Sequence, residues 1–184
     1  MLTLVHVLTW TGLVSAKPEH YKFTRLPNAT EDMPSDSYSG YLEISPTKKI
    51  HYIFVESQSH PETDPLLVWF NGGPGCSSLF GFMQEHGPFK IDDGQTELEV
   101  NPHPWNQQAS VLYIESPAGV GFSTVTDPGE LFYSDSSVAK DAMKALRIWY
   151  EQFPEYGWDQ QNNTLYITGE SYGGIYVPYL AWHI

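Results

Sequence analysis

The sequence predicts an α/β fold in which a doubly wound, largely parallel sheet follows an antiparallel hairpin. Two continuous apolar runs, Leu66–Phe70 and 111–114, have the composition of inner parallel strands that are covered on both faces. An amphipathic helical pattern over 135–153 separates them from a third β-rich run at 165–168. Strands that alternate with a helix in this way are typical of βαβ units in a parallel sheet.

The hairpin is predicted near the start of the chain. Segments 38–44 and 50–56 alternate between apolar and polar residues, and the residues between them, 45–49, have turn composition. Two alternating strands joined by a short polar turn indicate antiparallel neighbours.

The helix at 135–153 has Ser134 or Asp135 as its candidate N-cap, and Pro154 ends it because proline disfavours helical geometry in the preceding residue. Its apolar positions fall on one stripe, as expected for a helix that packs on a sheet. The stripe consists of Val138, Ala142, Ala145, Leu146, Trp149 and Phe153.

A serine flanked by glycines follows the third strand. Ser171 has Gly169 two residues before it and Gly173 two residues after it, and an apolar segment then continues as a helix to residue 184 despite Pro178. A strand, a G-x-S-x-G turn and a helix in this order predict a nucleophile elbow of the α/β-hydrolase type, with Ser171 as the catalytic nucleophile. The glycines are needed because the serine backbone at such a turn is strained and crowded.

A hydrolytic serine also needs backbone donors for the negative charge that develops on the substrate carbonyl oxygen. One donor is predicted to be the N–H group of Tyr172, directly after the nucleophile. The second is predicted in the glycine loop 71–75, which follows the strand Leu66–Phe70 and has the sequence Asn-Gly-Gly-Pro-Gly. We therefore expect this loop and Tyr172 to direct their amides toward one point.

Composition limits the class of partner. The chain has 184 residues, 41% of them hydrophobic, with nine basic and 22 acidic residues and a net charge of −13. This excess of negative charge repels nucleic acids and anionic membranes, so we expect no nucleic-acid partner, and we also expect no membrane-spanning segment. No motif calls for a metal or a cofactor, and we expect neither. No repeat or linker divides the chain, so residues 17–184 are expected to form one unit.

Residues 1–16 are predicted to be a secretory signal peptide. They contain no Asp, Glu, Lys or Arg and end in Val-Ser-Ala, and the apolar run is too short to span a membrane. An ordinary buried segment is the alternative. Asn28 and Asn162 lie in glycosylation sequons, which fits a protein of the secretory pathway.

Several longer motifs resemble the serine carboxypeptidase family, and its lysosomal members most closely. The two most specific are 69–78, Trp-Phe-Asn-Gly-Gly-Pro-Gly-Cys-Ser-Ser, and 169–174, Gly-Glu-Ser-Tyr-Gly-Gly. Further matches occur in the same order along the chain, at 38–42, 54–57, 85–89, 115–123 and 153–156. The resemblance extends over nearly all of residues 38–180.

The resemblance implies a role for particular residues. It places the nucleophile at Ser171 and the oxyanion donors at the backbone N–H groups of Gly73 and Tyr172. It also implies a site for the C-terminal carboxylate of a peptide substrate, and a disulfide from Cys76 to a cysteine that this chain does not contain. The implied carboxylate site consists of Asn71, Gly72, Glu85 and Glu170, with Trp69 lining it.

Two glutamates bind a carboxylate only if at least one of them keeps its proton. Two apposed carboxyl groups raise the pKa of at least one of them, and a protonated carboxyl donates a hydrogen bond. The resemblance therefore implies cleavage of peptides that have a free C-terminus, fastest at acidic pH. From the sequence alone, a solvated surface charge is the simpler interpretation of Glu85, and His86 beside it is assigned no role.

The family order of catalytic groups is Ser, Asp, His, yet after Ser171 the chain has no aspartate and only His183. Twelve residues along a helix is about 18 Å, which is far beyond hydrogen-bond reach. We therefore expect this chain to be the N-terminal part of such a domain, C-terminally truncated and not competent alone.

Three alternatives stay open at this point. Relatives of the same fold act as acyltransferases or as esterases, and a truncated isoform would have a non-catalytic, protective role. The resemblance also implies a homodimer or a glycosidase partner, and a lysosomal or extracellular location.

Overall fold

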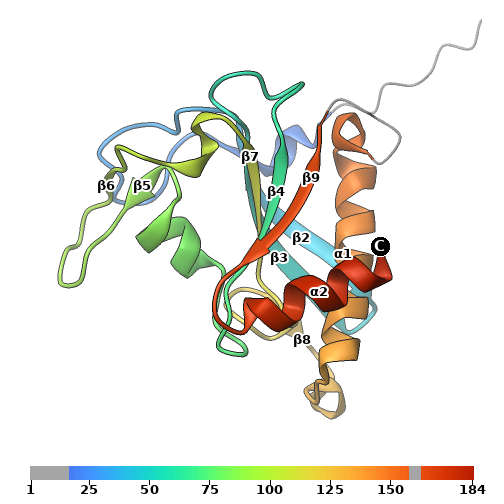
Figure 1. The fold of residues 1–184 in the computed structure, drawn as a ribbon. Helices are drawn as coiled ribbons and strands as arrows, with labels where there is room; N and C mark the ends of the chain where they lie inside the picture. Colours follow the sequence, from blue (N-terminus) through green and yellow to red (C-terminus); the bar gives the residue numbers. More distant parts are fainter. Residues whose placement is uncertain (1–16, 158–162) are drawn as a thin grey trace, which may run out of the picture.

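The computed structural model describes residues 17–157 and 163–184, so the predicted signal peptide at 1–16 and the sequon residue Asn162 lie outside the described residues. A mixed, seven-stranded sheet forms the centre of the molecule, with two helices packed on one face (Figure 1). The order across the sheet is β1-β2-β3-β7-β4-β9, and β8 pairs with the end of β3. The strands of this sheet are β1 (Lys22–Phe23), β2 (Ser37–Ser45), β3 (Lys48–Val55), β4 (Leu66–Phe70), β7 (Ser110–Ile114), β8 (Thr124–Val125) and β9 (Leu165–Gly169).

The hairpin is confirmed, with a shorter turn than the sequence predicts. Ser45 lies opposite Lys48, so only two residues connect β2 and β3. The predicted turn 45–49 is wrong at its second half because Lys49 belongs to β3, where it lies opposite Glu43 and its Nζ is 2.5 Å from the Glu43 carboxylate. The charges of this cross-strand pair favour the longer strand.

Strands β7, β4 and β9 are parallel to one another, as predicted. Val68 of β4 lies opposite Leu112 of β7 on one side and Ile167 of β9 on the other. Side chains alternate between the two faces of β4. Val68 therefore packs in the core beneath the helices, and Trp69 packs in the core on the opposite face.

Helix α1 (Asp135–Gln152) covers one face together with α2 (Gly173–His183). The predicted stripe is buried, and Trp149 packs edge-on against Phe54 with 4.9 Å between ring centroids. The predicted cap is also confirmed, since the Ser134 hydroxyl accepts a hydrogen bond from the Ser137 backbone N–H at 3.2 Å.

The opposite face of the sheet is covered by an irregular segment rather than by a long helix. It contains a short π-helix, Gly81–Glu85, and a separate two-stranded sheet of β5 (Phe89–Lys90) and β6 (Glu99–Val100). Figure 1 shows this segment beside the sheet, away from α1 and α2. Short 3₁₀ turns complete the described chain at Glu19–Tyr21, Trp105–Gln107, Pro128–Glu130 and Pro154–Tyr156.

The parallel strands place three loops at one edge of the sheet. The carboxyl ends of β4, β7 and β9 lead into loop 71–78, loop 115–123 and the turn at Ser171. Ligands of open α/β sheets bind at this edge. Within the described residues, no helix combines the length and the apolar character needed to cross a membrane.

Candidate active site

Ser171 lies at a sharp turn between β9 and α2, and its φ angle is 52°. This left-handed conformation costs a residue other than glycine on the order of 1–3 kcal/mol, and such strain is typical of functional sites. The neighbouring glycines are required, because a Cβ at Gly169 would lie 2.6 Å from the carbonyl oxygen of Phe70 and one at Gly173 would lie 3.0 Å from it. The strained, crowded elbow predicted from the sequence is confirmed.

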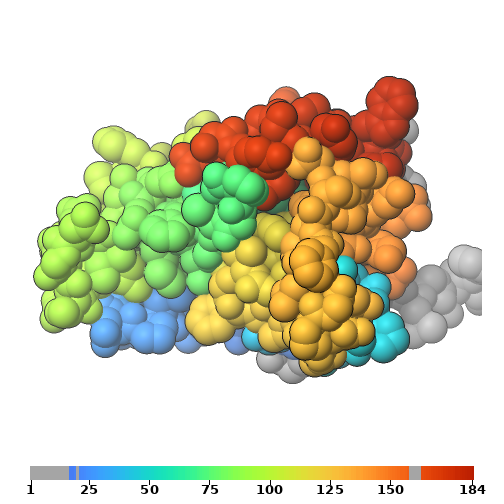
Figure 2. All heavy atoms as spheres, turned by 90° about the horizontal axis from the view of Figure 1, so that it is seen from below, coloured from blue at the N-terminus to red at the C-terminus, as the bar shows by residue number. Residues whose placement is uncertain are grey.

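The glycine loop packs directly against this elbow. A Cβ at Gly72 would lie 2.5 Å from the backbone nitrogen of Tyr172 and 2.9 Å from the Cβ of Ser171. Gly73 has a φ of 108°, which favours glycine, and the Gly75 N–H donates to the hydroxyl of Tyr176 at 3.2 Å. The loop, drawn in green in Figure 2, lies beside the red C-terminal segment. Two segments about a hundred residues apart therefore meet at Ser171, as the sequence predicts.

Asn71 links the glycine loop to the two glutamates. Its side-chain oxygen accepts hydrogen bonds from Trp69 Nε1 at 2.7 Å and from the Gly81 backbone N–H at 3.0 Å. These two donors fix the amide orientation, so the NH₂ group faces the acids and donates to Glu170 Oε1 at 2.9 Å. Asn71 also forms a side-chain hydrogen bond with Glu85. The structure thus brings together the predicted carboxylate-site residues of three separate segments.

Glu85 ends the π-helix Gly81–Glu85 and is half-buried. Burial raises the pKa of the Glu85 carboxyl, the charge of Glu170 raises it further, and the hydrogen bond with Asn71 lowers it in part. The pKa of Glu85 therefore lies above its ordinary value, which is the direction that favours the protonated carboxyl. The backbone here is fixed, since Asn101 Nδ2 donates to the Gly87 carbonyl at 2.8 Å.

The Ser171 hydroxyl has no hydrogen-bond partner in the part of the chain that the structure describes, residues 17–157 and 163–184. His183 ends α2, which begins at Gly173, so the length of the helix separates it from the nucleophile. The sequence-based exclusion of His183 agrees with this geometry.

Sequence reasoning assigns no role to Glu115, which directly follows β7. Its carboxylate is fully buried and accepts hydrogen bonds from His51 Nδ1 at 2.8 Å, from the Phe122 N–H at 2.8 Å and from the Ser77 hydroxyl. Burial alone raises the pKa of Glu115, but these hydrogen bonds outweigh it and hold the pKa below its ordinary value. Glu115 therefore ties Ser77, two residues beyond the glycine loop, to the end of the sheet. Its sequence signal is an acidic residue that directly follows an apolar strand.

His51 completes a serine–histidine–carboxylate arrangement, because its Nε2 lies 2.9 Å from the Ser39 hydroxyl. Ser39 lies in the middle of β2, where it is paired with Ile53 of β3. A serine within a paired strand lacks the exposed turn and the free backbone donors that acyl transfer requires. This arrangement supports the fold and is distinct from the nucleophile.

Two further predicted positions lie at the surface. Asn28 is exposed, with a φ of 58°, so the side chain that would carry a glycan is open to solvent. Cys76 is exposed and is the single cysteine of the chain, so the implied disulfide has no partner here.

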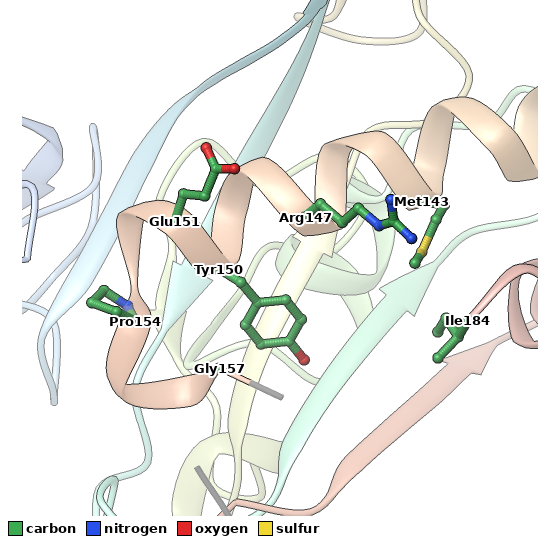
Figure 3. Close-up of a pocket in the computed structure, with 7 residues that line it drawn as sticks. All are labelled: Met143, Arg147, Tyr150, Glu151, Pro154, Gly157 and Ile184. Atoms are coloured by element: carbon green, nitrogen blue, oxygen red, sulfur yellow. The ribbon is translucent and has the colours of Figure 1, made fainter. Parts of the chain in front are cut away.

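Two hollows on the surface differ in their position relative to Ser171. A hollow of about 540 Å³ lies between α1 and the end of α2, where Arg147, Tyr150 and Ile184 line it (Figure 3). None of the predicted site residues lines it. A smaller hollow of about 300 Å³ opens beside Tyr172 and is bounded by Gly75 of the glycine loop. Of these two hollows, the smaller one adjoins the elbow.

Comparison with known proteins agrees with this geometry. The family described as "Serine carboxypeptidase" matches residues 27–184. The "Lysosomal protective protein" of Mus musculus is 47% identical over 180 residues, which cover 98% of this chain and 37% of that protein. "Serine carboxypeptidase-like 20" of Arabidopsis thaliana is 40% identical over 188 residues, covering 98% of this chain and 36% of that protein.

The solved structures give the same result. The prohormone-processing carboxypeptidase Kex1ΔP from Saccharomyces cerevisiae superposes with a TM-score of 0.75 at 26% identity, covering 91% of this chain and 39% of that one. The chain therefore spans little more than a third of the length of these relatives. Because the family matches residues 27–184 of this chain, the chain belongs to the serine carboxypeptidases, hydrolases of the α/β-hydrolase fold.

Proposed function

We propose that the protein is a serine-type carboxypeptidase that removes C-terminal residues from peptides through an acyl-enzyme. The observation that carries this proposal is the hydrogen bond of 2.9 Å between Asn71 and Glu170, the residue directly before Ser171. A carboxypeptidase must hold the terminal carboxylate one residue away from the carbonyl that it attacks. The cluster of Asn71, Glu85 and Glu170 beside the nucleophile supplies such an arrangement.

In this proposal the chain supplies the nucleophile and the backbone donors that stabilise the oxyanion. Ser171 attacks the last peptide carbonyl, and the backbone N–H groups of Gly73 and Tyr172 donate to the oxygen that becomes negatively charged. The close packing of Gly72 on Tyr172 supports a shared site for these donors. Glu115, through Ser77, holds the far end of the same loop.

The proton acceptor for Ser171 is proposed to come from the remaining part of the complete protein. The relatives are much longer than the matched span, and the hydrolase order places the acid and the histidine after the nucleophile. Without them a serine hydroxyl is a weak nucleophile.

The proposed pH dependence follows from Glu85. A protonated Glu85 donates a hydrogen bond to the substrate carboxylate, whereas the ionised pair with Glu170 repels it. Because the pKa of Glu85 is raised, its carboxyl keeps its proton to a higher pH than an ordinary glutamate does, which supports activity at acidic pH.

We also propose that the protein enters the secretory pathway and acts in the lysosome or outside the cell. The charge-free apolar segment 1–16, the exposed sequon at Asn28 and the name of the mouse relative support this location.

The test compares two substrates on the protein expressed from its complete transcript. We expect hydrolysis of a blocked dipeptide with a free C-terminus at acidic pH, and little hydrolysis of the same dipeptide with a C-terminal amide. Ser171→Ala should abolish the reaction. Equal rates on both dipeptides, or an active Ser171→Ala variant, would refute the carboxypeptidase assignment. A faster reaction on an activated ester alone would instead indicate an esterase.

A further inference from the structure

His86 has an unpaired polar atom beside the carboxylate site. The residue is only 5% exposed, and its Nε2 has no hydrogen-bond partner among the described residues. Buried polar atoms are nearly always paired in folded proteins, so an orphaned one indicates a missing partner. We therefore expect Nε2 to gain a hydrogen-bond partner when a ligand occupies the site.

The imidazole ring cannot turn to find a partner. It stacks on Trp105 with 4.0 Å between ring centroids, and Trp69 packs edge-on against it at 4.3 Å. The backbone is held on both sides, because the His86 N–H donates to the Gly81 carbonyl and the His86 carbonyl accepts from the Trp105 N–H, both at 2.9 Å. Any partner must therefore move toward the ring.

The hydrogen bond with Tyr113 decides which ring nitrogen carries the proton. The buried Tyr113 hydroxyl lies 3.1 Å from His86 Nδ1. If the hydroxyl donates, the proton of the neutral ring is on Nε2 and only that N–H is unpaired. If Nδ1 donates instead, both the tyrosine O–H and the bare Nε2 are left without partners. Because fewer unpaired groups are favoured, the Nε2–H tautomer is expected.

Glu85 is the group in position to accept from this donor. Its Oε2 lies 3.9 Å from His86 Nε2, and its side chain is 35% exposed, so it is free to move toward the ring. The other charged groups that act on His86 and Glu85 are Lys90 and Glu170. Burial lowers the pKa of His86 to about 4, with Lys90 adding to the effect, so the ring is neutral at mildly acidic pH and acts as a donor without a charge.

We propose that His86 is a positioning residue for Glu85, donating from Nε2 to Glu85 Oε2 when a C-terminal carboxylate occupies the site. This inference rests on the proposed function. A protonated carboxyl group has one O–H donor, and its other oxygen, the carbonyl oxygen, is the stronger acceptor. With Oε2 occupied as the acceptor, the proton of Glu85 lies on the other oxygen, Oε1, from which it is donated to the substrate carboxylate. His86 thereby selects the orientation in which Glu85 binds an anion.

Nuclear magnetic resonance of the imidazole nitrogens tests this directly. On the complete protein labelled with ¹⁵N-histidine at pH 5.5, we expect His86 to show the Nε2–H tautomer. Addition of N-benzoyl-phenylalanine should shift the Nε2 resonance, and addition of its C-terminal amide should not. An Nδ1–H tautomer, or an Nε2 resonance that does not respond to the acid, would overturn the proposal.

Two variants of the complete protein separate positioning from a structural role. His86→Phe keeps the ring stack but removes the donor, and we expect it to raise KM for a free C-terminal dipeptide roughly ten-fold with kcat nearly unchanged. His86→Gln keeps an N–H group near the Nε2 position and should recover most of this loss. Equal KM values for wild type and His86→Phe, or a parallel loss of kcat, would contradict the proposal.

Glu85→Gln distinguishes failure of this inference from failure of the proposed function. If Glu85→Gln changes neither KM nor the response of His86 to the acid, the carboxylate site itself is assigned wrongly. If Glu85→Gln alters KM while His86→Phe does not, only the role of His86 is wrong.

Discussion

Gly72 leaves no space for a side chain, since a Cβ there would lie 2.5 Å from the backbone nitrogen of Tyr172. We predict that Gly72→Ala displaces the glycine loop from the elbow and lowers kcat of the complete protein roughly 10²-fold, as loss of one oxyanion donor does. The matched control is Gly174→Ala, because a Cβ at Gly174 meets nothing within 4 Å. The control should retain full activity. A Gly72→Ala variant with wild-type kcat would show that the contact is not needed for catalysis.

Glu85 determines the predicted pH profile. Burial and the charge of Glu170 raise its pKa, so its protonated fraction falls as pH rises through that raised pKa. KM for a free C-terminal dipeptide should therefore increase with pH over this range, and Glu85→Gln, which is always neutral, should remove this dependence. The measurement is KM between pH 4 and 7 in both proteins. A wild-type KM that is flat over this interval would contradict the account.

At the scale of elements, the cap of α1 is the clearest target. The Ser134 hydroxyl accepts from the Ser137 N–H, and the Ser137 hydroxyl accepts from the Ser134 N–H at 2.9 Å. Ser134→Ala should lower the free energy of unfolding by about 1 kcal/mol. Urea denaturation of the chain measures this loss, and Ser136→Ala, two residues further along the first turn of α1, is the control. Similar losses for both variants would indicate that the cap contributes little.

Elements with a repeating apolar pattern could be predicted from the sequence. Helix α1 and strands β4, β7 and β9 begin and end within a residue or two of their predicted bounds. Their hydrophobic periodicity is local and is reinforced by signals such as Pro154. The short π-helix Gly81–Glu85 has no such period and is held by tertiary packing of Phe82, so the position of Glu85 beside Glu170 followed only from family resemblance.

The same limit applies to the site. Ser171 and the glycine loop were predictable because strand, turn and helix are contiguous in the sequence. The roles of Glu115 and His86 depend on partners that are distant along the chain, His51 and Tyr113 respectively. No pattern in a single sequence states which buried acid meets which histidine.

At the scale of the whole molecule, β9 is the outermost strand of the described sheet and adjoins α2. Apolar side chains are exposed here, including Tyr166 on β9 and Trp182 on α2. No described group forms a hydrogen bond with the Ser171 hydroxyl. We therefore predict that residues 17–184 alone release no amino acid from a blocked dipeptide, whereas the complete protein does. Robust turnover by residues 17–184 would show that a base for Ser171 lies within this span.

The most direct test is a crystal structure of the complete protein after reaction with a peptide phosphonate, which mimics the tetrahedral intermediate. The account predicts a covalent bond from phosphorus to the Ser171 hydroxyl oxygen. The phosphonyl oxygen should lie about 2.7–3.1 Å from the backbone nitrogens of both Gly73 and Tyr172. An adduct on another residue, or a phosphonyl oxygen that faces solvent away from these two amides, would contradict it.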